Sequence, residues 1–419
     1  MIKPQTLKGF RDFLPQEARK RQYVISKLKR VFESFGFEPL ETPVLEYEEI
    51  LTGKYGEEGD QLMYRFEDNG KRRVAMRYDQ TVPLARVVAQ YQNDLPTIFK
   101  RYQIQPVWRA ENTQKGRYRE FLQCDADIVG TNSPLAEAEV IAIVDKSLKT
   151  IGFDKYQIIV NDRKLLFEKI KTAGVDETLS LQVIREIDKL GKIAWQELDK
   201  NLLALGLSKD VVTNLNTELS ITQPIEQDPY LDPIINAAKK LGVTSIVPKR
   251  YLARGLNYYT GLIFEVQIDG YPVGSVCGGG RYDNLVGMFA DRQIPAVGFA
   301  FGFDRILEAM EALNLFPKDL ANSVSKVLVT IFTEKTKQQS LEIVSRLREK
   351  NINAEIYLGE IKEKNPLEKQ LKYADQKQIP YVIIIGPEEA EKKIVTLKNL
   401  QTREQKTYTF EELLPILQS

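Results

Sequence analysis

Histidine is absent from this chain of 419 residues, and cysteine occurs only twice. Without an imidazole there can be no Ser-His-Asp or Cys-His nucleophile, no histidine metal ligand and no histidine general base near neutral pH. Cys124 and Cys277 are too few for a structural zinc site or a disulfide framework, which favours a reducing compartment. Chemistry in this protein must therefore depend on carboxylates, guanidinium groups, hydroxyls and bound cations.

Several other common signals are missing. The sequence has no apolar run near the roughly 20 residues that span a bilayer, no signal-peptide pattern, and neither a Walker A nor a Rossmann glycine motif. Apolar residues make up 43% and charged residues 28%, and the formal net charge is +1. We expect a soluble, cytoplasmic protein of two or three domains with no membrane partner, in which local basic patches would have to hold any nucleic acid.

The N-terminal segment predicts a helix followed by an irregular strand. Apolar positions recur at helical spacing in residues 15–37, at Val24, Leu28, Val31 and Phe35. Gly36 is suited to end this helix. In the extended residues 37–45, Pro39 and Pro43 require an edge or irregular position. From these residues alone the pattern indicates an amphipathic helix packed on a sheet.

Residues 100–130 predict a β-hairpin. Residues 101–109 and 118–129 form its strands, and the polar residues 112–117 form its loop. One face of the second strand is apolar, with Leu122, Cys124, Ala126 and Ile128. The other face carries Phe121, Gln123, Asp125 and Asp127. Two carboxylates two residues apart repel each other unless they meet solvent or a cation, so this face is either solvated or a binding surface.

The rest of the chain contains two regions that differ in their predicted secondary structure. Helix-forming residues dominate from about 165 to 245, which predicts a helical insertion without a recognisable motif. Short apolar strands alternate with amphipathic helices after residue 325, which predicts a compact α/β domain over 326–419 with a largely parallel sheet. We therefore expect residues 1–325 to form one large α+β domain that contains the insertion.

Arginines are the candidate phosphate ligands, because their forked donors fit phosphate oxygens bidentately. Four occur in unusual surroundings: Arg109, Arg117, Arg254 and Arg305. Arg109 ends a strand and is followed by Glu111, Arg254 precedes a glycine, and Arg305 lies where a glycine-rich strand enters a helix. An isolated arginine is more often a surface residue, so the prediction that these arginines bind phosphate depends on their sequence contexts.

Acidic and amide side chains form a second group, suited to a small cationic ligand. Asp79 and Thr81 point the same way on an extended chain, and Gln123 and Asp127 share one strand face. A carboxylate is the group that would bind an ammonium or a protonated imidazole nitrogen. A polar pocket of this kind discriminates strongly, because a wrong ligand leaves buried partners unpaired.

Two adjacent tyrosines, Tyr258 and Tyr259, add a hydroxyl and an aromatic wall, although alternate residues of a strand would face opposite sides. Arg254 and Tyr259 are separated by five positions and reach one pocket only if the backbone bends, for which Gly255 is suited. The glycines at 278–280 can let the backbone approach a ligand or can form a plain tight turn.

These segments together resemble the histidyl-tRNA synthetases, a family of class II aminoacyl-tRNA synthetases. The resemblance covers nearly the whole chain, from residues 8–12 (KGFRD) to the C-terminal domain. It is strongest in five motifs: residues 77–83 (RYDQTVP), 109–127, 254–265 (RGLNYYTGLIFE), 275–283 (SVCGGGRYD) and 298–305 (GFAFGFDR).

The resemblance implies an antiparallel-sheet catalytic domain, a C-terminal anticodon-binding domain and a homodimer joined through the helix and strand that end near Pro43. It implies that L-histidine and ATP, with Mg2+, give histidyl-adenylate, from which the histidyl group passes to the 3′ end of tRNA(His). This chemistry needs no histidine, because the nucleophile is the substrate's own ionised carboxylate.

The same resemblance implies roles for individual residues. Arg109 and Arg254 are the expected catalytic residues, at the α-phosphate and the substrate carboxylate. Histidine would be bound by Asp79, Gln80, Thr81, Gln123, Asp127, Tyr258 and Tyr259. ATP would be bound by Arg109, Glu111, Arg117, Phe121 and Arg305. The acceptor stem of tRNA would contact Gln114 and Lys115.

The chain departs from the family pattern at two positions, with Asn257 in place of the usual aspartate and Asp304 in place of the commoner glutamate. Two other functions remain open on the same scaffold. One is a regulatory subunit of ATP phosphoribosyltransferase, which typically lacks the C-terminal domain. The other is a non-catalytic tRNA-binding or polymerase-accessory protein, which need not keep Arg109, Arg254 and Arg305 together.

Overall fold

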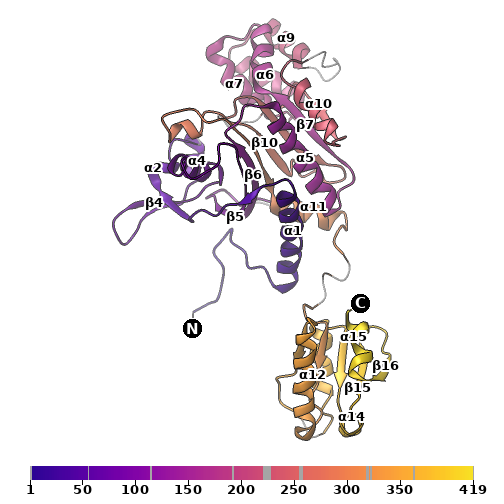
Figure 1. Ribbon diagram of the computed structural model, residues 1–419. Helices are drawn as coiled ribbons and strands as arrows, with labels where there is room; N and C mark the ends of the chain where they lie inside the picture. Colours follow the sequence, from indigo (N-terminus) through magenta and orange to yellow (C-terminus); the bar gives the residue numbers. More distant parts are fainter. Residues whose placement is uncertain are drawn as a thin grey trace. The chain divides into compact units, whose positions relative to one another are not determined.

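The computed structural model divides the chain into two compact units, Met1–Asp12 with Arg21–Phe316, and Phe13–Lys20 with Pro317–Ser419 (Figure 1). The structure describes residues 2–54, 56–113, 116–190, 193–219, 228–253, 258–317, 320, 323–361 and 364–418. No helix in these ranges is long and apolar enough to cross a bilayer.

An eight-stranded sheet forms the centre of the first unit, in the order β1-β5-β6-β11-β10-β9-β7-β8. Its strands are β1 (Glu38–Pro39), β5 (Phe99–Trp108), β6 (Glu120–Val129), β7 (Tyr156–Asp162), β8 (Ile246–Pro248), β9 (Leu262–Ile268), β10 (Cys277–Arg281) and β11 (Ala296–Gly302). All inner pairs are antiparallel, and only the edge strands β1 and β8 pair in parallel. Pro39 lies in β1 at the sheet edge, as expected for a residue without an amide hydrogen.

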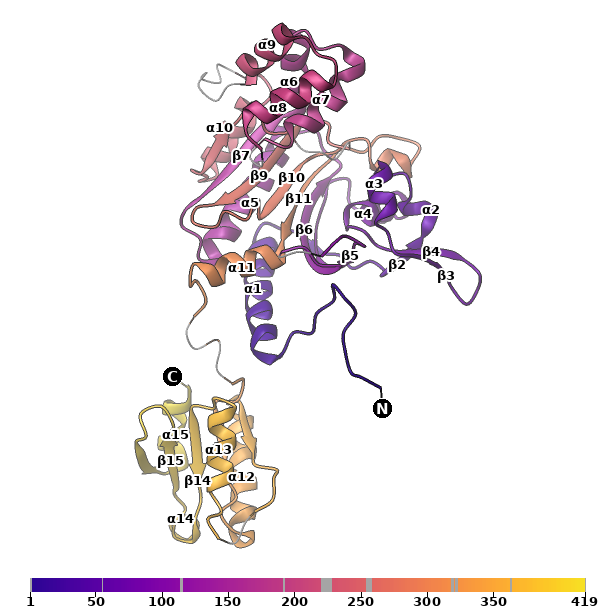
Figure 2. The ribbon, with the colours of Figure 1, turned by 180° about the vertical axis from the view of Figure 1, so that it is seen from behind.

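Helices cover one face of this sheet (Figures 1 and 2). They are α1 (Pro15–Ser34), α5 (Pro134–Ile151), α10 (Asp232–Lys240) and α11 (Phe303–Ala312). The predicted helix therefore forms, and Val24, Leu28 and Val31 pack in the same core as Cys124 and Ala126 of β6. Burial of these apolar side chains fixes which face of β6 meets the helices, so the polar side chains of β6 project from the opposite face.

The first unit also contains a second, smaller sheet with its own helices. A three-stranded sheet, β2-β4-β3, packs with short helices. Its parts are β2 (Leu45–Tyr47), α2 (Glu48–Leu51), α3 (Gly56–Gln61), β3 (Arg65–Glu67), β4 (Arg73–Met76) and α4 (Thr81–Gln90). A separate core of buried side chains from α4, β4 and neighbouring segments, including Leu84 and Ala75, supports it. This arrangement brings the start of α4 to the end of β4.

The helical segment lies between β7 and β8, which are parallel neighbours. Parallel strands need a crossover connection, and here the helical segment forms part of it. Its helices are α6 (Arg163–Thr172), α7 (Ser180–Ile187), α8 (Trp195–Ala204) and α9 (Lys209–Leu219), followed by α10. Helices α6 to α9 have a hydrophobic core of their own, built on residues such as Leu198 and Leu215.

The second unit is an α/β domain with a sheet in the order β13-β12-β14-β15-β16. Its elements are β12 (Val327–Val329), α12 (Lys337–Glu349), β13 (Ala354–Ile356), α13 (Glu368–Gln376), β14 (Tyr381–Ile384), α14 (Pro387–Lys392), β15 (Val395–Asn399), β16 (Gln405–Tyr408) and α15 (Phe410–Gln418). The expectation of a largely parallel sheet is wrong for its second half, because β14–β15 and β15–β16 are antiparallel. Residues 385–394 and 400–404 are shorter than the dozen or so residues of a parallel crossover.

The three glycines at 278–280 do not form a tight turn. They lie inside β10, between β9 and β11. A Cβ on Gly279 would lie 2.3 Å from the carbonyl oxygen of Gly298 and 2.7 Å from Cζ of Phe264. Glycine is needed at this position because the neighbouring strand and a buried ring occupy the space of a side chain.

Gly279→Ala is expected to lower the free energy of unfolding by about 1–3 kcal/mol, as overpacking of a well-packed core typically does. Gly302→Ala is the matched control, because its Cβ would meet no atom closer than 3.6 Å and its φ of −72° suits alanine. The control should stay within about 1 kcal/mol of wild type in denaturant unfolding. Equal stability of the two variants would show that β10 has room for a side chain at 279.

Candidate active site

A pocket of about 340 Å³ opens on the face of the central sheet opposite the helices α1, α5 and α11. Four parts of the chain build it: the end of β4 with the start of α4, the β5–β6 hairpin with the polar face of β6, residues 258–259 before β9, and the strands β10 and β11 with the start of α11. The predicted site residues that line it are Asp79, Thr81, Arg109, Glu111, Arg117, Phe121, Gln123, Asp127, Tyr258, Tyr259 and Arg305. The polar face of β6 is therefore a pocket wall and not a solvated surface.

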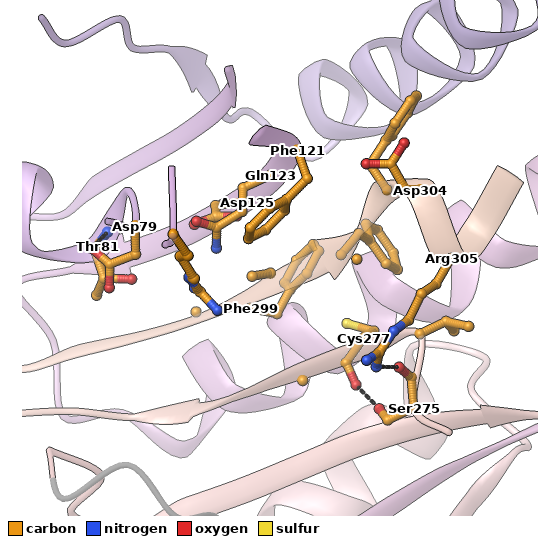
Figure 3. A pocket seen from close by; sticks show the side chains of 18 of the residues that line it. Asp79, Thr81, Phe121, Gln123, Asp125, Ser275, Cys277, Phe299, Asp304 and Arg305 are labelled. Atoms are coloured by element: carbon orange, nitrogen blue, oxygen red, sulfur yellow. Dashed lines mark hydrogen bonds between the residues drawn. The ribbon is translucent and has the colours of Figure 1, made fainter. Parts of the chain in front are cut away.

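The pocket has two chemically different ends (Figure 3). Asp79 and Thr81 lie at one end, and Asp304 and Arg305 lie at the other. The side chains of β6 lie between them, with Phe121 beside Gln123 and Asp125. One end is thus rich in hydrogen-bond acceptors, and the opposite end offers an arginine.

Asp127 is held at the floor of the pocket by two neighbours. It is 3% exposed, its Oδ2 lies 2.7 Å from Nη2 of the fully buried Arg101, and its Oδ1 accepts a hydrogen bond from the hydroxyl of Tyr282. Burial raises the pKa of the Asp127 carboxyl, while Arg101 and the Tyr282 hydroxyl act in the opposite direction. The ion pair follows from the hairpin register, which places Arg101 directly across from Asp127.

Gly298 makes room for this carboxylate. Gly298 lies on β11 and pairs with Asp127 of the neighbouring strand β6, and a Cβ on Gly298 would lie 1.8 Å from Oδ1 of Asp127. Any side chain at 298 would therefore displace the Asp127 carboxylate from its present position. The glycine-rich strand that the sequence placed before Arg305 thus shapes the acidic end of the pocket.

Asp79 and Gln80 play different parts at the start of α4. Oδ1 of Asp79 accepts hydrogen bonds from the backbone amides of Thr81 and Val82, both at 3.1 Å, so this carboxylate caps the helix while it lines the pocket. Gln80 was expected among the histidine ligands, yet it is fully buried and is not among the described residues that line the pocket. Its amide nitrogen donates to the carbonyl oxygens of Gln105, at 2.8 Å, and Gln123. Gln80 therefore joins α4 to the sheet, because the turn of the chain directs its side chain away from the cavity.

Arg109 is positioned by aromatic rings. Its Cζ lies 4.4 Å from the ring centroid of Tyr78 and 5.1 Å from that of Phe121, and its Nε donates to the carbonyl oxygen of Tyr78 at 3.1 Å. Arg117 lies beside Glu111, with 3.6 Å between Nη1 and the nearest carboxylate oxygen. The guanidinium of Arg109 is thus oriented before any ligand arrives.

The opposite end of the pocket is organised at the start of α11. Nη1 of Arg305 donates to the carbonyl oxygen of Ser275 at 2.8 Å, as the dashed line in Figure 3 shows. The neighbouring Asp304 is ion-paired with Arg11 at 3.0 Å and with Arg21 at 2.7 Å. Asp304 therefore connects α11 with the N-terminal segment of the same unit. This aspartate, which replaces the commoner glutamate, has a structural role here.

Both tyrosines line the pocket, and their ring centroids are 4.8 Å apart. They precede β9, which begins at Leu262, so strand alternation does not apply to them. Tyr258 also makes an edge-on contact with Tyr282 at 5.9 Å. The other predicted residues of this segment, Arg254, Gly255 and Asn257, lie outside the described residues, as do Gln114 and Lys115 of the hairpin loop.

Sequence reasoning missed three residues that shape the acidic end: Arg101, Tyr282 and Asp125. Arg101 could have been found from the hairpin, because pairing Trp108 with Glu120 places Arg101 opposite Asp127. Asp125 was noted on the correct face of β6 but was given no role. Tyr282 lies in the motif at 275–283 but was given no role. It follows β10 directly, and its contact with Asp127 of β6 reaches across the intervening strand β11.

The comparisons with known proteins agree with this geometry. A family model described as histidyl-tRNA synthetase matches residues 9–306, and one described as an anticodon binding domain matches residues 326–419. The histidine–tRNA ligase of Cytophaga hutchinsonii is 40% identical over 455 aligned positions, which cover 99% of this chain and 99% of the relative. That of Rhodopirellula baltica is also 40% identical and covers 99% of this chain and 97% of the relative.

Among solved structures, the crystal structure of histidyl-tRNA synthetase from Nostoc sp. PCC 7120 superimposes with a TM-score of 0.85 at 30% identity and full coverage of both chains. A Bacillus halodurans protein described as an ATP phosphoribosyltransferase regulatory subunit/histidyl-tRNA synthetase has a TM-score of 0.73 at 21% identity, which is a likeness of fold alone. Because the family model covers most of the chain and full-length relatives share 40% of its residues, this chain belongs to the histidyl-tRNA synthetase family.

Proposed function

We propose that the pocket on the central sheet is where this histidine–tRNA ligase activates L-histidine with ATP before transferring it to tRNA(His). The observation that carries the proposal is the set of side chains that lines this one cavity. Carboxylate and amide oxygens that can accept hydrogen bonds from an amino acid lie at one end, Arg305 lies at the other end, and Phe121 lies between them. Arg109 also lines this cavity and lies close to the ring of Phe121. A ligand with a cationic and a triphosphate part is complementary to this arrangement.

Histidine would occupy the acidic end. Asp79, with the hydroxyl of Thr81 beside it, would receive one cationic or donor group, and Gln123 and Asp127 would receive another. Oε1 of Gln123 is buried and has no hydrogen-bond partner within the described ranges, so it is available to a ligand donor. The rings of Tyr258 and Tyr259 would enclose the substrate side chain.

ATP would extend toward α11. Phe121 offers a face for the adenine ring, Arg109 and Arg254 would meet the α-phosphate, and Arg305 would meet the far phosphates. Glu111 and Arg117 line the same part of the cavity and would complete the nucleotide site. Within the described residues no group of three or more histidine, cysteine or acidic side chains could hold a metal ion. Mg2+ would therefore reach the site on the oxygens of ATP, where it would offset phosphate charge.

Adenylate formation needs positioning and charge stabilisation and no protein base. An oxygen of the histidine carboxylate would attack the α-phosphorus of ATP, the bond to the bridging oxygen of the β-phosphate would break, and pyrophosphate would leave. The 3′-terminal hydroxyl of tRNA would then attack the carbonyl carbon of the adenylate. The bond from this carbon to the phosphate oxygen would break, AMP would leave, and the hydroxyl proton would pass to the departing phosphate or to water. Arg109, held between the rings of Tyr78 and Phe121, is oriented to offset the charge that develops in the first step.

We also propose that the chain forms a homodimer with two-fold symmetry. A groove of about 790 Å³ runs between residues 40–50, the β3–β4 hairpin and α4. Beside it are exposed apolar side chains, at Val44, Leu45, Tyr47, Phe66 and Tyr91. A second copy could cover such a patch through an isologous contact.

Histidine-dependent exchange of pyrophosphate into ATP is the direct test of the first step. Wild type should show exchange, and Arg254→Ala should reduce it about 10²–10³-fold, by analogy with loss of one donor at a developing charge. The control is Arg185→Ala, at an exposed position of α7. No exchange by wild type would contradict the proposed activity, and normal exchange by the Arg254 variant would remove only the role of that residue.

Assembly can be measured by light scattering at micromolar concentration. The expected mass is twice the chain mass of 48.0 kDa. Leu45→Asp should shift the protein toward monomer, because it places a charge in the proposed apolar contact. Leu181→Asp, also an exposed leucine but in the helical segment, should leave the dimer intact. A wild-type monomer would exclude the interface.

Deletion of residues 326–419 should leave pyrophosphate exchange largely intact, because the two units have separate hydrophobic cores. Charging of tRNA should fall by at least about tenfold, the equivalent of 1.4 kcal/mol of lost binding. The salt dependence of charging should also weaken as phosphate contacts are lost. Undiminished charging by the truncated protein would show that this domain does not recognise tRNA.

A further inference from the structure

Asp125 is a pocket carboxylate to which the family resemblance assigns no role. It lies at the centre of β6 between Gln123 and Asp127, lines the cavity, and is 2% exposed. Its Oδ1 is buried and has no hydrogen-bond partner among the described residues. A buried acceptor without a donor is costly, and in a native structure it needs an explanation.

The neighbouring strands do not provide that donor. Gln103 lies across from Asp125 on β5, but its amide nitrogen donates to Oγ1 of Thr42 at 2.8 Å and to Oε1 of Gln105 at 2.6 Å. On the other side the paired residue is Ala300, which has no polar side chain. Of the two residues paired with Asp125 on the neighbouring strands, one therefore uses its donors elsewhere and the other has none.

The two other carboxylates of the acidic end, unlike Asp125, have donors within the protein. Asp127 is ion-paired with Arg101 and accepts a hydrogen bond from Tyr282, and Asp79 accepts two backbone amides at the start of α4. Arg101 forms its ion pair with Asp127 at 2.7 Å, and within the described ranges Asp125 has no ion pair. Of these three carboxylates, Asp125 is thus the one with the fewest donors in the part of the chain that the structure describes.

The electrostatic surroundings of Asp125 also favour binding of a cation beside it. Burial raises the pKa of the Asp125 carboxyl well above its usual range, and the nearby Asp127 and Asp79 add to this effect, while Arg101 and Arg109 oppose it. The ionised form of Asp125 therefore carries a free-energy cost that the surrounding side chains offset only in part. A ligand cation in the cavity would offset that cost, because an opposite charge favours the ionised carboxylate.

We propose that Asp125 accepts a hydrogen bond from a protonated nitrogen of the bound amino acid and is a specificity-determining residue of the pocket. The inference rests on the proposed function, because it takes L-histidine as the ligand. Histidine offers two such nitrogens, the α-ammonium group and the imidazole ring. Either source has the same chemistry, and the two can be separated by experiment.

The test compares Asp125→Asn with Asp162→Asn in the full-length protein. Asp162 is a matched control, because it is also buried, and burial raises the pKa of its carboxyl to about 6, but it caps α6 and is not among the described pocket residues. Asparagine keeps the shape of the side chain and removes its charge. Affinities for histidine and for ATP are measured by titration calorimetry, together with the melting temperature.

Asp125→Asn should weaken histidine binding at least about tenfold and leave ATP binding unchanged, because one charged acceptor is lost. Its melting temperature should equal or exceed that of wild type, because a buried carboxylate without a donor is removed. Asp162→Asn should leave both affinities unchanged. Wild-type affinity for histidine in the Asp125 variant would overturn the inference, as would loss of both ligands with a lowered melting temperature, which indicates a structural role.

The nitrogen can be identified by nuclear magnetic resonance of 15N-labelled histidine in the complex. Since the chain has no histidine, a protein without a polyhistidine tag contributes no imidazole signals. If the ring is the donor, the pKa of bound imidazole should lie above the ordinary value of about 6.5 in wild type and fall in Asp125→Asn. If the α-ammonium group is the donor, affinity falls but the ring pKa stays the same. Failure of the proposed function would appear separately, as absence of histidine-dependent exchange in wild type.

Discussion

The two faces of strand β6 set the constraint on which the rest of the catalytic unit depends. One face buries Cys124, Ala126 and Ile128 against the helices, and the other presents Gln123, Asp125 and Asp127 to the pocket. Side chains alternate along a strand, so a shift of one residue in register would exchange these faces. The apolar core therefore fixes where the acidic groups stand, and the ten-residue pairing with β5 places Arg101 against Asp127.

Charge in this pocket is controlled without an imidazole. Asp127 is compensated by Arg101, Asp79 by two backbone amides, and Arg109 is oriented by aromatic rings. Adenylate formation suits this design, because the attacking carboxylate of the substrate is already ionised, and the enzyme of this family has to place charges and does not have to move protons in that step.

Some local patterns had two structural solutions, between which the sequence could not decide. Three consecutive glycines allowed a tight turn or a close approach to a ligand. At 278–280 they lie in the middle of a sheet, where Phe264 and the backbone at Gly298 occupy the space of a side chain at 279. Gln80 stands between two pocket residues in the sequence but points to the sheet, because the chain turns into α4 at that point. In both cases the deciding neighbour is far away in the sequence.

The sequence by itself determined the chemistry of this protein: the motifs at 77–83, 109–127 and 298–305 specify an acidic group, an arginine-rich group and the strand pattern that carries them. It also determined the helix and hairpin, since both depend on local periodicity. Only the tertiary structure decided which charges are compensated, through Arg101 and Tyr282, and which acceptor, on Asp125, has no partner among the described residues. The physical reason is that charge compensation in a buried site depends on distances of a few ångströms between strands, and these distances follow from packing and not from sequence spacing.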